Sequence, residues 1–62
     1  MSPDEIKRIR KILNLTQQKL ADLIGAGQHT VARWETGLHN PTGAYLMALR
    51  GLAEKAKRKR KA

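Results

Sequence analysis

Residues 25–37, which read GAGQHTVARWETG, place three different hydrogen-bonding side chains within one short segment. Gln28 carries an amide, His29 an imidazole and Arg33 a guanidinium. A glutamine amide can bond the edge of adenine through two hydrogen bonds, and an arginine can do the same with guanine. The chemistry that these residue types favour is therefore recognition of base edges in the major groove of DNA.

The spacing of the apolar residues predicts a helix over residues 28–36. Val31 and Trp34 are three positions apart, so a helix places them on one stripe that packs inward. The opposite stripe faces outward, and its small central residue would let the helix approach a groove closely. That outward stripe consists of Gln28, His29, Ala32, Arg33 and Thr36. The alternative is an ordinary solvated surface, because polar residues on an outer face are common.

Glycines on both sides of this helix predict how it is positioned. A second helix is expected from Thr16, its N-cap, to Gly25, which suits a left-handed C-terminal position. Only residues 25–27 connect the two helices, and a three-residue turn with glycine between short helices is typical of a helix-turn-helix. Gly37 ends the later helix, and Asn40-Pro41 lies in the short loop before the next helix.

Two further helices complete the predicted fold. Ser2 and Glu5 form a capping box, with Pro3 in the first turn, at the start of the first helix. No segment alternates with a period of two, so we expect an all-α domain. Its apolar positions are expected to be Ile6, Ile9, Ile12 and Leu13; Leu20, Ala21, Leu23 and Ile24; and Tyr45, Leu46, Leu49, Leu52 and Ala53, with Trp34 and Tyr45 in the core.

Arg10 falls on the apolar stripe of the first helix and therefore points at least partly inward. A buried charge is costly unless it is paired and hydrogen-bonded. Glu35 is the only acidic residue of the predicted helix over residues 28–36, so we predict a structural Arg10–Glu35 ion pair. The alternative is that Arg10 extends to the surface and meets solvent or phosphate.

Charge divides the 62-residue chain into two parts. Residues 1–54 carry seven basic and five acidic side chains, and residues 55–62 hold six basic side chains and no acidic one. We therefore predict a domain over 1–54 and a basic C-terminal tail over 55–62. Such a run favours nucleic-acid binding, although a solvated helix end would look the same.

Composition argues against several other classes of protein. No apolar run approaches the roughly 18–20 residues that cross a bilayer, so we expect no membrane partner. The chain has no cysteine, as is common in the reducing cytosol. His29 and His39 lack the spacing of a paired helical metal site, and the acidic residues form no catalytic group. We therefore expect no enzymatic activity, no metal and no cofactor.

With these residues in place, the sequence resembles the Cro/C1-type helix-turn-helix family, also called Xre or phage repressor-like. The string LTQQKLADLIGAGQHTVARWETG, the following Asn-Pro and a last apolar helix carry the likeness, which covers residues 6–53. It implies a small all-α bundle of four to five helices, similar to lambda repressor. It also implies a sequence-specific repressor or regulator that binds double-stranded DNA in a prokaryotic cytoplasm, at the nucleoid.

The resemblance also implies roles for particular residues. Positions matching Gln28, His29, Ala32 and Arg33 read bases, and the glutamine matching Gln17 contacts the sugar–phosphate backbone. Helix N-termini favour phosphate, and Gln17 and Gln18 sit in the first turn of the second helix. The full set of predicted backbone contacts is Gln17, Gln18, Lys19, Thr30, Thr36, His39 and Asn40. The candidate phosphate contacts also include Lys7, Lys11 and the residues around Leu38–Asn40.

A narrower likeness is to the C-terminal domain of MqsA-type antitoxins. The Gly-Ala-Gly turn and the aromatic-Glu-x-Gly ending before Asn-Pro carry it. In that subgroup the residues matching His29 and Arg33 are the principal base readers, and the domain is a dimeric repressor of its own operon. Those proteins have a separate N-terminal zinc domain that meets the toxin. This sequence lacks that domain, which leaves open an excised domain or a stand-alone relative. A homodimer, and a partner protein that binds through a missing domain, also stay open.

A protein–protein adaptor is the alternative function, because a fold alone does not fix function. On that reading the basic tail would dock an acidic partner or bind nucleic acid without sequence preference. Binding to random and selected duplexes across a salt series distinguishes the two functions.

Overall fold

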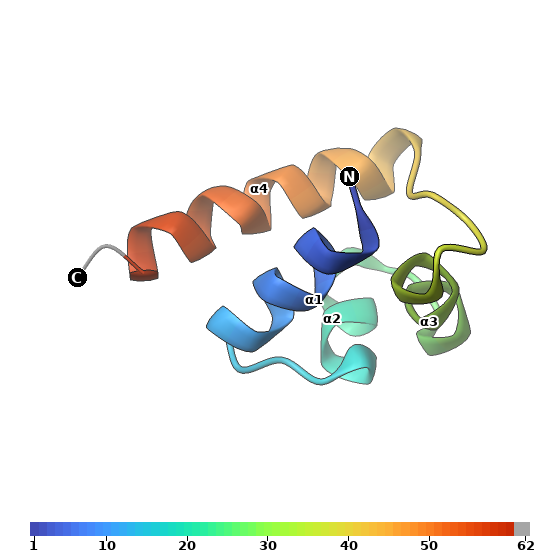
Figure 1. Cartoon of the computed structure of the whole chain (residues 1–62), viewed down its shortest axis with the longest axis horizontal. Helices are drawn as coiled ribbons and strands as arrows, with labels where there is room; N and C mark the ends of the chain where they lie inside the picture. The colour runs from blue at the N-terminus through green and yellow to red at the C-terminus, as the bar shows by residue number, and fades with distance from the viewer. Residues whose placement is uncertain (61–62) are drawn as a thin grey trace.

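Four helices make up the computed structural model, which describes residues 1–60 (Figure 1). They are α1 (Pro3–Ile12), α2 (Gln17–Ile24), α3 (Gln28–Thr36) and α4 (Gly43–Arg60). The described residues contain no strand, so the predicted all-α fold is confirmed. In Figure 1 α4 lies along the top, α1 lies beneath it with α2 below, and α3 lies at the right-hand end of the molecule. No helix in this part of the chain is long and apolar enough to cross a membrane.

The first two helices begin where the sequence predicts, because side chains satisfy their free N–H groups. The Ser2 hydroxyl accepts from the Glu5 N–H at 3.2 Å, and the Glu5 carboxylate accepts from the Ser2 N–H at 3.1 Å. Thr16 accepts from the Lys19 N–H at 3.0 Å and so caps α2. Asn14, in the connection between α1 and α2, has a φ of 57°, a conformation that asparagine tolerates better than most residues.

The turn between α2 and α3 depends on the backbone freedom of glycine. Gly25 ends α2 with a φ of 76° and a ψ of 25°, in the left-handed region. Gly27 is the N-cap of α3, so α3 begins three residues after Gly25. This tight turn fixes the angle at which α3 leaves α2, and it is the predicted helix-turn-helix corner.

A pair of glycine-to-alanine substitutions tests this dependence on backbone conformation. Gly25→Ala should lower the free energy of unfolding by about 1 kcal/mol, because an alanine is strained at positive φ. A new Cβ meets nothing within 4 Å at either Gly25 or Gly51. Gly51→Ala, inside α4, should therefore raise the free energy by about 0.5–1 kcal/mol. Urea unfolding of both variants measures the difference, and equal shifts in the same direction would contradict the assignment of strain to Gly25.

One cluster of side chains from all four helices forms the core. α1 contributes Ile6, and α4 contributes Leu49, both fully buried. Trp34 is 3 % exposed, and its ring centroid lies 5.5 Å from that of Tyr45 at a tilt of 57°. The complete cluster is Ile6, Leu20, Ala21, Val31, Trp34 and Leu49.

Two predicted core positions differ from the structure. Leu23 is 61 % exposed. α2 turns Leu20, Ala21 and Ile24 toward its neighbours, and at 100° per residue Leu23 lies at the margin of that face. Tyr45 is 37 % exposed, because it lies in the first turn of α4, where only one side of its ring meets Trp34.

α4 continues past the last apolar residue that the sequence predicts for it. The helix passes through the expected boundary between residues 54 and 55 without a break, and Ala56 is 3 % exposed. Residues 55–60 are therefore helical, and residues 61–62 of the predicted tail lie outside the described residues. The sequence does not reveal Ala56 as a core residue, because it stands alone within a run of lysine and arginine.

Candidate nucleic-acid interface

The inner side of α3 is fixed to the rest of the domain. Val31 is fully buried, and Trp34 and Glu35 are 3 % and 5 % exposed. These three residues point toward the other helices, and α3 packs mainly on α2 and α1. The helix is therefore held rigidly by one side only.

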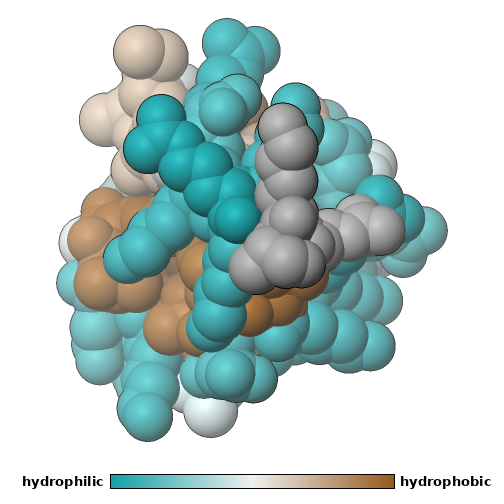
Figure 2. Space-filling view, turned by 90° about the vertical axis from the view of Figure 1, so that its left-hand side faces the viewer, coloured by the Kyte–Doolittle hydropathy of each residue, from teal (hydrophilic) through white to brown (hydrophobic). Residues whose placement is uncertain are grey.

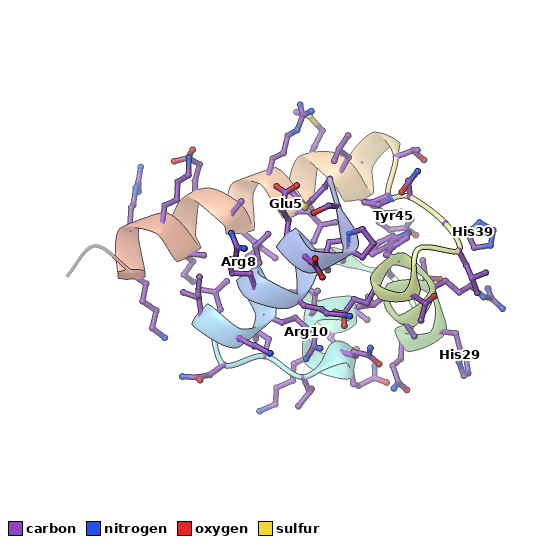
Figure 3. The ribbon with its side chains drawn as sticks, in the orientation of Figure 1. Glu5, Arg8, Arg10, His29, His39 and Tyr45 are labelled. Atoms are coloured by element: carbon purple, nitrogen blue, oxygen red, sulfur yellow. The ribbon has the colours of Figure 1, made fainter. Side chains whose placement is uncertain are left out.

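The outer side of α3 is open to solvent. Gln28, His29 and Arg33 are exposed, and Ala32 between them is half-buried. Figure 3 shows the His29 side chain projecting from the body on the side away from α4. We call Gln28, His29, Ala32 and Arg33 the reading face. An α-helix fits the major groove of B-DNA, so this face can meet base edges there.

The end of α3 is closed by a Schellman motif. Gly37 has a φ of 86°, its N–H donates to the Trp34 carbonyl, and the Leu38 N–H donates to the Arg33 carbonyl at 3.0 Å. The Thr36 hydroxyl also donates to the Arg33 carbonyl at 3.0 Å. The loop that follows holds His39 exposed beside this end of α3, as Figure 3 shows. The motif fixes the backbone of Arg33 and leaves its guanidinium exposed.

The first turn of α2 lies beside the C-terminal half of α3. Gln17 Nε2 donates to Glu35 Oε1 at 3.2 Å, which joins the two helices. Gln18 and Lys19 follow on the exposed side, and Gln18 Nε2 donates to the Asp22 carboxylate at 2.9 Å. The first N–H groups of a helix have no acceptor within the helix and favour an anion such as phosphate. The structure therefore brings a candidate phosphate site next to the reading face.

Arg10 and Glu35 form an ion pair that connects α1 to α3. The Arg10 Nε and Nη2 atoms donate to the two carboxylate oxygens of Glu35, the second at 2.8 Å. Arg10 Nη1 donates to the Leu15 carbonyl at 3.1 Å. The Glu35 side chain is 3 % exposed and that of Arg10 is 19 % exposed. No buried side-chain N or O atom among the described residues lacks a hydrogen-bond partner, so this network is complete.

The same network sets the ionisation of its members. The pKa of Arg10 is raised by its hydrogen bonds to Glu35, and this exceeds the opposing effect of burial. Burial alone would raise the pKa of Glu35. The hydrogen bonds from Arg10 and Gln17, with the charges of Arg10 and Lys7, outweigh burial and hold that pKa below its usual 4.5. Glu35 is therefore a carboxylate at neutral pH, as the bidentate pair requires.

We expect this lowered pKa to appear as acid sensitivity. Because the folded pKa of Glu35 lies below the unfolded one, its contribution to stability is complete above about pH 4.5 and is lost as pH falls through the folded value. A Glu35→Gln variant has no carboxylate at this position, so it lacks this contribution at every pH. The difference in unfolding free energy between wild type and variant should therefore shrink from pH 7 to pH 3. The cap residue Glu5 also has a lowered pKa, but it is present in both proteins and cancels. A difference that stays constant with pH would contradict the assignment to Glu35.

Most residues predicted for the interface lie on α3, in the first turn of α2 and in the loop that follows α3. Their exposure differs. Gln17, Thr30 and Ala32 are half-buried, whereas the exposed ones are Gln18, Lys19, Gln28, His29, Arg33, Thr36, His39 and Asn40. The bond from Gln17 to Glu35 was not predicted, because it joins residues 18 positions apart on different helices. It ties a candidate phosphate contact to the same carboxylate that anchors α3.

Comparison with known proteins agrees with this geometry. A helix-turn-helix family matches residues 6–51, which is most of the chain. A curated relative, the type II methyltransferase M.SsoII of Shigella sonnei, is 45 % identical over 47 residues. That alignment covers 71 % of this chain and 12 % of the relative, so the chain spans about an eighth of the methyltransferase's length. No solved structure matched. With the turn at residues 25–27 and the exposed face of α3, the match shows that this chain belongs to the Cro/C1-type helix-turn-helix family of DNA-binding domains.

Proposed function

We propose that the chain binds double-stranded DNA at specific sequences and acts as a transcriptional regulator, with α3 in the major groove. The observation that carries this proposal is the two-sided character of α3. Val31, Trp34 and Glu35 hold its inner side, and the reading face opposite them is open to solvent. On this proposal Gln28 and Arg33 bond adenine and guanine edges, and Ala32 contacts a thymine methyl group. His29 also hydrogen-bonds a base, and His29 and Arg33 are the main base readers, with Gln28 assisting.

Contacts to the DNA backbone would position α3 in the groove. We assign them to the first turn of α2, to the ends of α3 and to the loop that follows α3. Phosphate contacts orient a protein on the duplex without reading its sequence. The assigned residues are Gln17, Gln18, Lys19, Thr30, Thr36, His39 and Asn40.

The finer biological role is repression of the Cro/C1 kind in a prokaryotic cytoplasm, with no catalytic activity in this chain. The likeness to the DNA-binding domain of MqsA-type antitoxins supports a repressor that works as a homodimer. If so, two half-sites should lie about 10 base pairs apart, one turn of the duplex. In the methyltransferase relative, a similar segment makes up 12 % of a much longer protein. This supports a DNA-binding module that is joined to other domains. A partner protein would then bind through such a domain.

Selection of bound duplexes from a random library tests the proposal. We expect enrichment of one sequence, bound about 10³-fold or more tightly than random DNA at the same salt concentration. The matched control is a variant without the reading-face side chains, carrying Gln28→Ala, His29→Ala and Arg33→Ala, which should enrich nothing. Binding that depends steeply on salt but shows no preferred sequence in the wild type would favour the adaptor or non-specific alternative.

A further inference from the structure

The last turns of α4 carry a cluster of positive charge that the reading face does not use. Lys55, Lys57, Arg58 and Lys59 are all exposed, and we call them the basic end. None of them forms a salt bridge, because the described residues contain only the one between Arg10 and Glu35. At 100° per residue Lys55 and Lys59 leave the helix on one side, and Lys57 and Arg58 leave it in two other directions. Together they surround the solvent side of the helix with positive charge.

The basic end lies far from the reading face. α4 has 18 residues, so it is about 27 Å long, and its C-terminal end extends beyond the other helices in Figure 1. α3 lies at the opposite end of the molecule's longest axis, which measures 33 Å. In Figure 3 the His29 side chain points away from α4. A duplex held in the major groove by α3 would therefore leave the basic end free.

Positive side chains also lie on α1, next to α4. Arg8 and Lys57 line one groove between the two helices, and its lining also includes the acidic Glu5 and the buried Ile9 and Ala56. Figure 2 looks at this end of the molecule and shows hydrophilic side chains projecting over a band of apolar surface. Arg8 points toward α4 in Figure 3. The charge is therefore spread over two helices.

The fold accounts for only part of this cluster. The helix dipole favours cations within the last turn of a helix, which holds Lys57, Arg58 and Lys59 but not Lys55. Lys55 and Lys59 are four residues apart on the same side of α4, and a like-charge pair at this spacing destabilises a helix slightly. An anionic ligand would remove this repulsion.

The geometry points to the basic end as a second DNA site, which holds the phosphate backbone of another duplex while α3 holds the first. A row of phosphates suits cations that face several directions, whereas one carboxylate would engage only one of them. The bridging of two duplexes rests on the proposed function of the reading face. Binding of DNA to the basic end alone does not.

The first test separates the two surfaces by the salt dependence of binding to a random duplex. The basic-end variant carries Lys55→Gln, Lys57→Gln, Arg58→Gln and Lys59→Gln. Its plot of log affinity against log salt should be shallower than that of wild type, by roughly 0.9 for each cation that contacted a phosphate. An arginine control, which carries Lys55→Arg, Lys57→Arg and Lys59→Arg, keeps the charge and should keep the slope. Circular dichroism verifies that both variants fold.

The second test measures bridging directly. A duplex with the selected sequence is immobilised, saturated with protein and offered a fluorescent random duplex. Wild type and the arginine control should retain the fluorescent duplex. The basic-end variant should bind the first duplex normally and retain at least tenfold less of the second. Retention that survives in the basic-end variant would mean that a dimer holds both duplexes through its reading faces, and would overturn the proposal.

Other occupants of the basic end give distinct results. Polyglutamate and duplex RNA are each tested as competitors against unlabelled DNA, at equal concentrations of charge. If either of them displaces the fluorescent duplex at a lower concentration than DNA does, the surface belongs to that ligand and the proposal is overturned. Failure of the two proposals can also be distinguished. If α3 reads no sequence, library selection fails while the slope difference persists. If the basic end binds no DNA, selection succeeds and no second duplex is retained.

Discussion

Replacing Arg10 with alanine is expected to lower the free energy of unfolding by about 3 kcal/mol, because it leaves the carboxylate of Glu35 buried without its partner. Glu35 is 5 % exposed, and its remaining side-chain donor is Gln17. A domain of this size rarely has more than about 3–5 kcal/mol of folding free energy. Most molecules of the Arg10→Ala variant should therefore be unfolded at moderate temperature. Thermal and urea unfolding, followed by circular dichroism, measure the loss.

Neighbouring and graded substitutions make this prediction specific. Arg8 is exposed on the same helix, so Arg8→Ala should change stability by no more than about 0.5 kcal/mol. Arg10→Lys keeps the charge but loses the bidentate geometry. Its free energy of unfolding should lie between those of wild type and Arg10→Ala. In a double-mutant cycle with Glu35→Ala, measured in a stabilising osmolyte, the two losses should be strongly non-additive. Additive losses would show that the pair contributes no coupling between α1 and α3.

Arg33→Ala is expected to cost about 1–3 kcal/mol of binding to the selected sequence and to relax the preference at one base pair. Arg33 is exposed on the reading face and its backbone is held by the Schellman motif, so the substitution should remove the proposed base contact without disturbing α3. Binding to random duplexes should change much less. Affinity measurements on the selected duplex and on its single-base variants reveal which position loses discrimination.

Lys19→Ala is the matched control for Arg33→Ala. Lys19 is exposed near the start of α2, where we propose a phosphate contact. Its removal should weaken binding to all sequences by a similar factor and reduce the salt slope by roughly 0.9. Equal losses on selected and random DNA for Arg33→Ala would argue against direct reading by this residue.

The helices could be predicted from the sequence because their ends are local features. Ser2 with Glu5, Thr16, Gly25 and Gly37 each act within a few residues of their own position in the chain. The period of the apolar residues then fixed which side of α3 faces inward. The predicted reading face is exposed for the same reason, while its role in binding stays a prediction.

The Arg10–Glu35 pair could be predicted because burial of one charge requires a partner, and few acidic residues were available. Gln17 offered no comparable signal, since a polar side chain near the start of a helix can remain exposed to solvent without any protein partner. Leu23 was wrongly predicted to be buried because it lies at the margin of the inward face of α2, where periodicity alone does not decide burial. Ala56 was missed because its burial depends on how α4 packs on α1, which belongs to the packed domain and is not visible in local periodicity.

The central claim is that the outer face of α3 contacts the bases of DNA, and an NMR titration with the selected duplex tests it most directly. We expect the largest changes at the side-chain resonances of Gln28, His29 and Arg33, with intermolecular contacts from these groups to base protons. The indole of Trp34 should change little, because it is buried. Changes confined to α4, with the α3 side chains unaffected, would contradict the account.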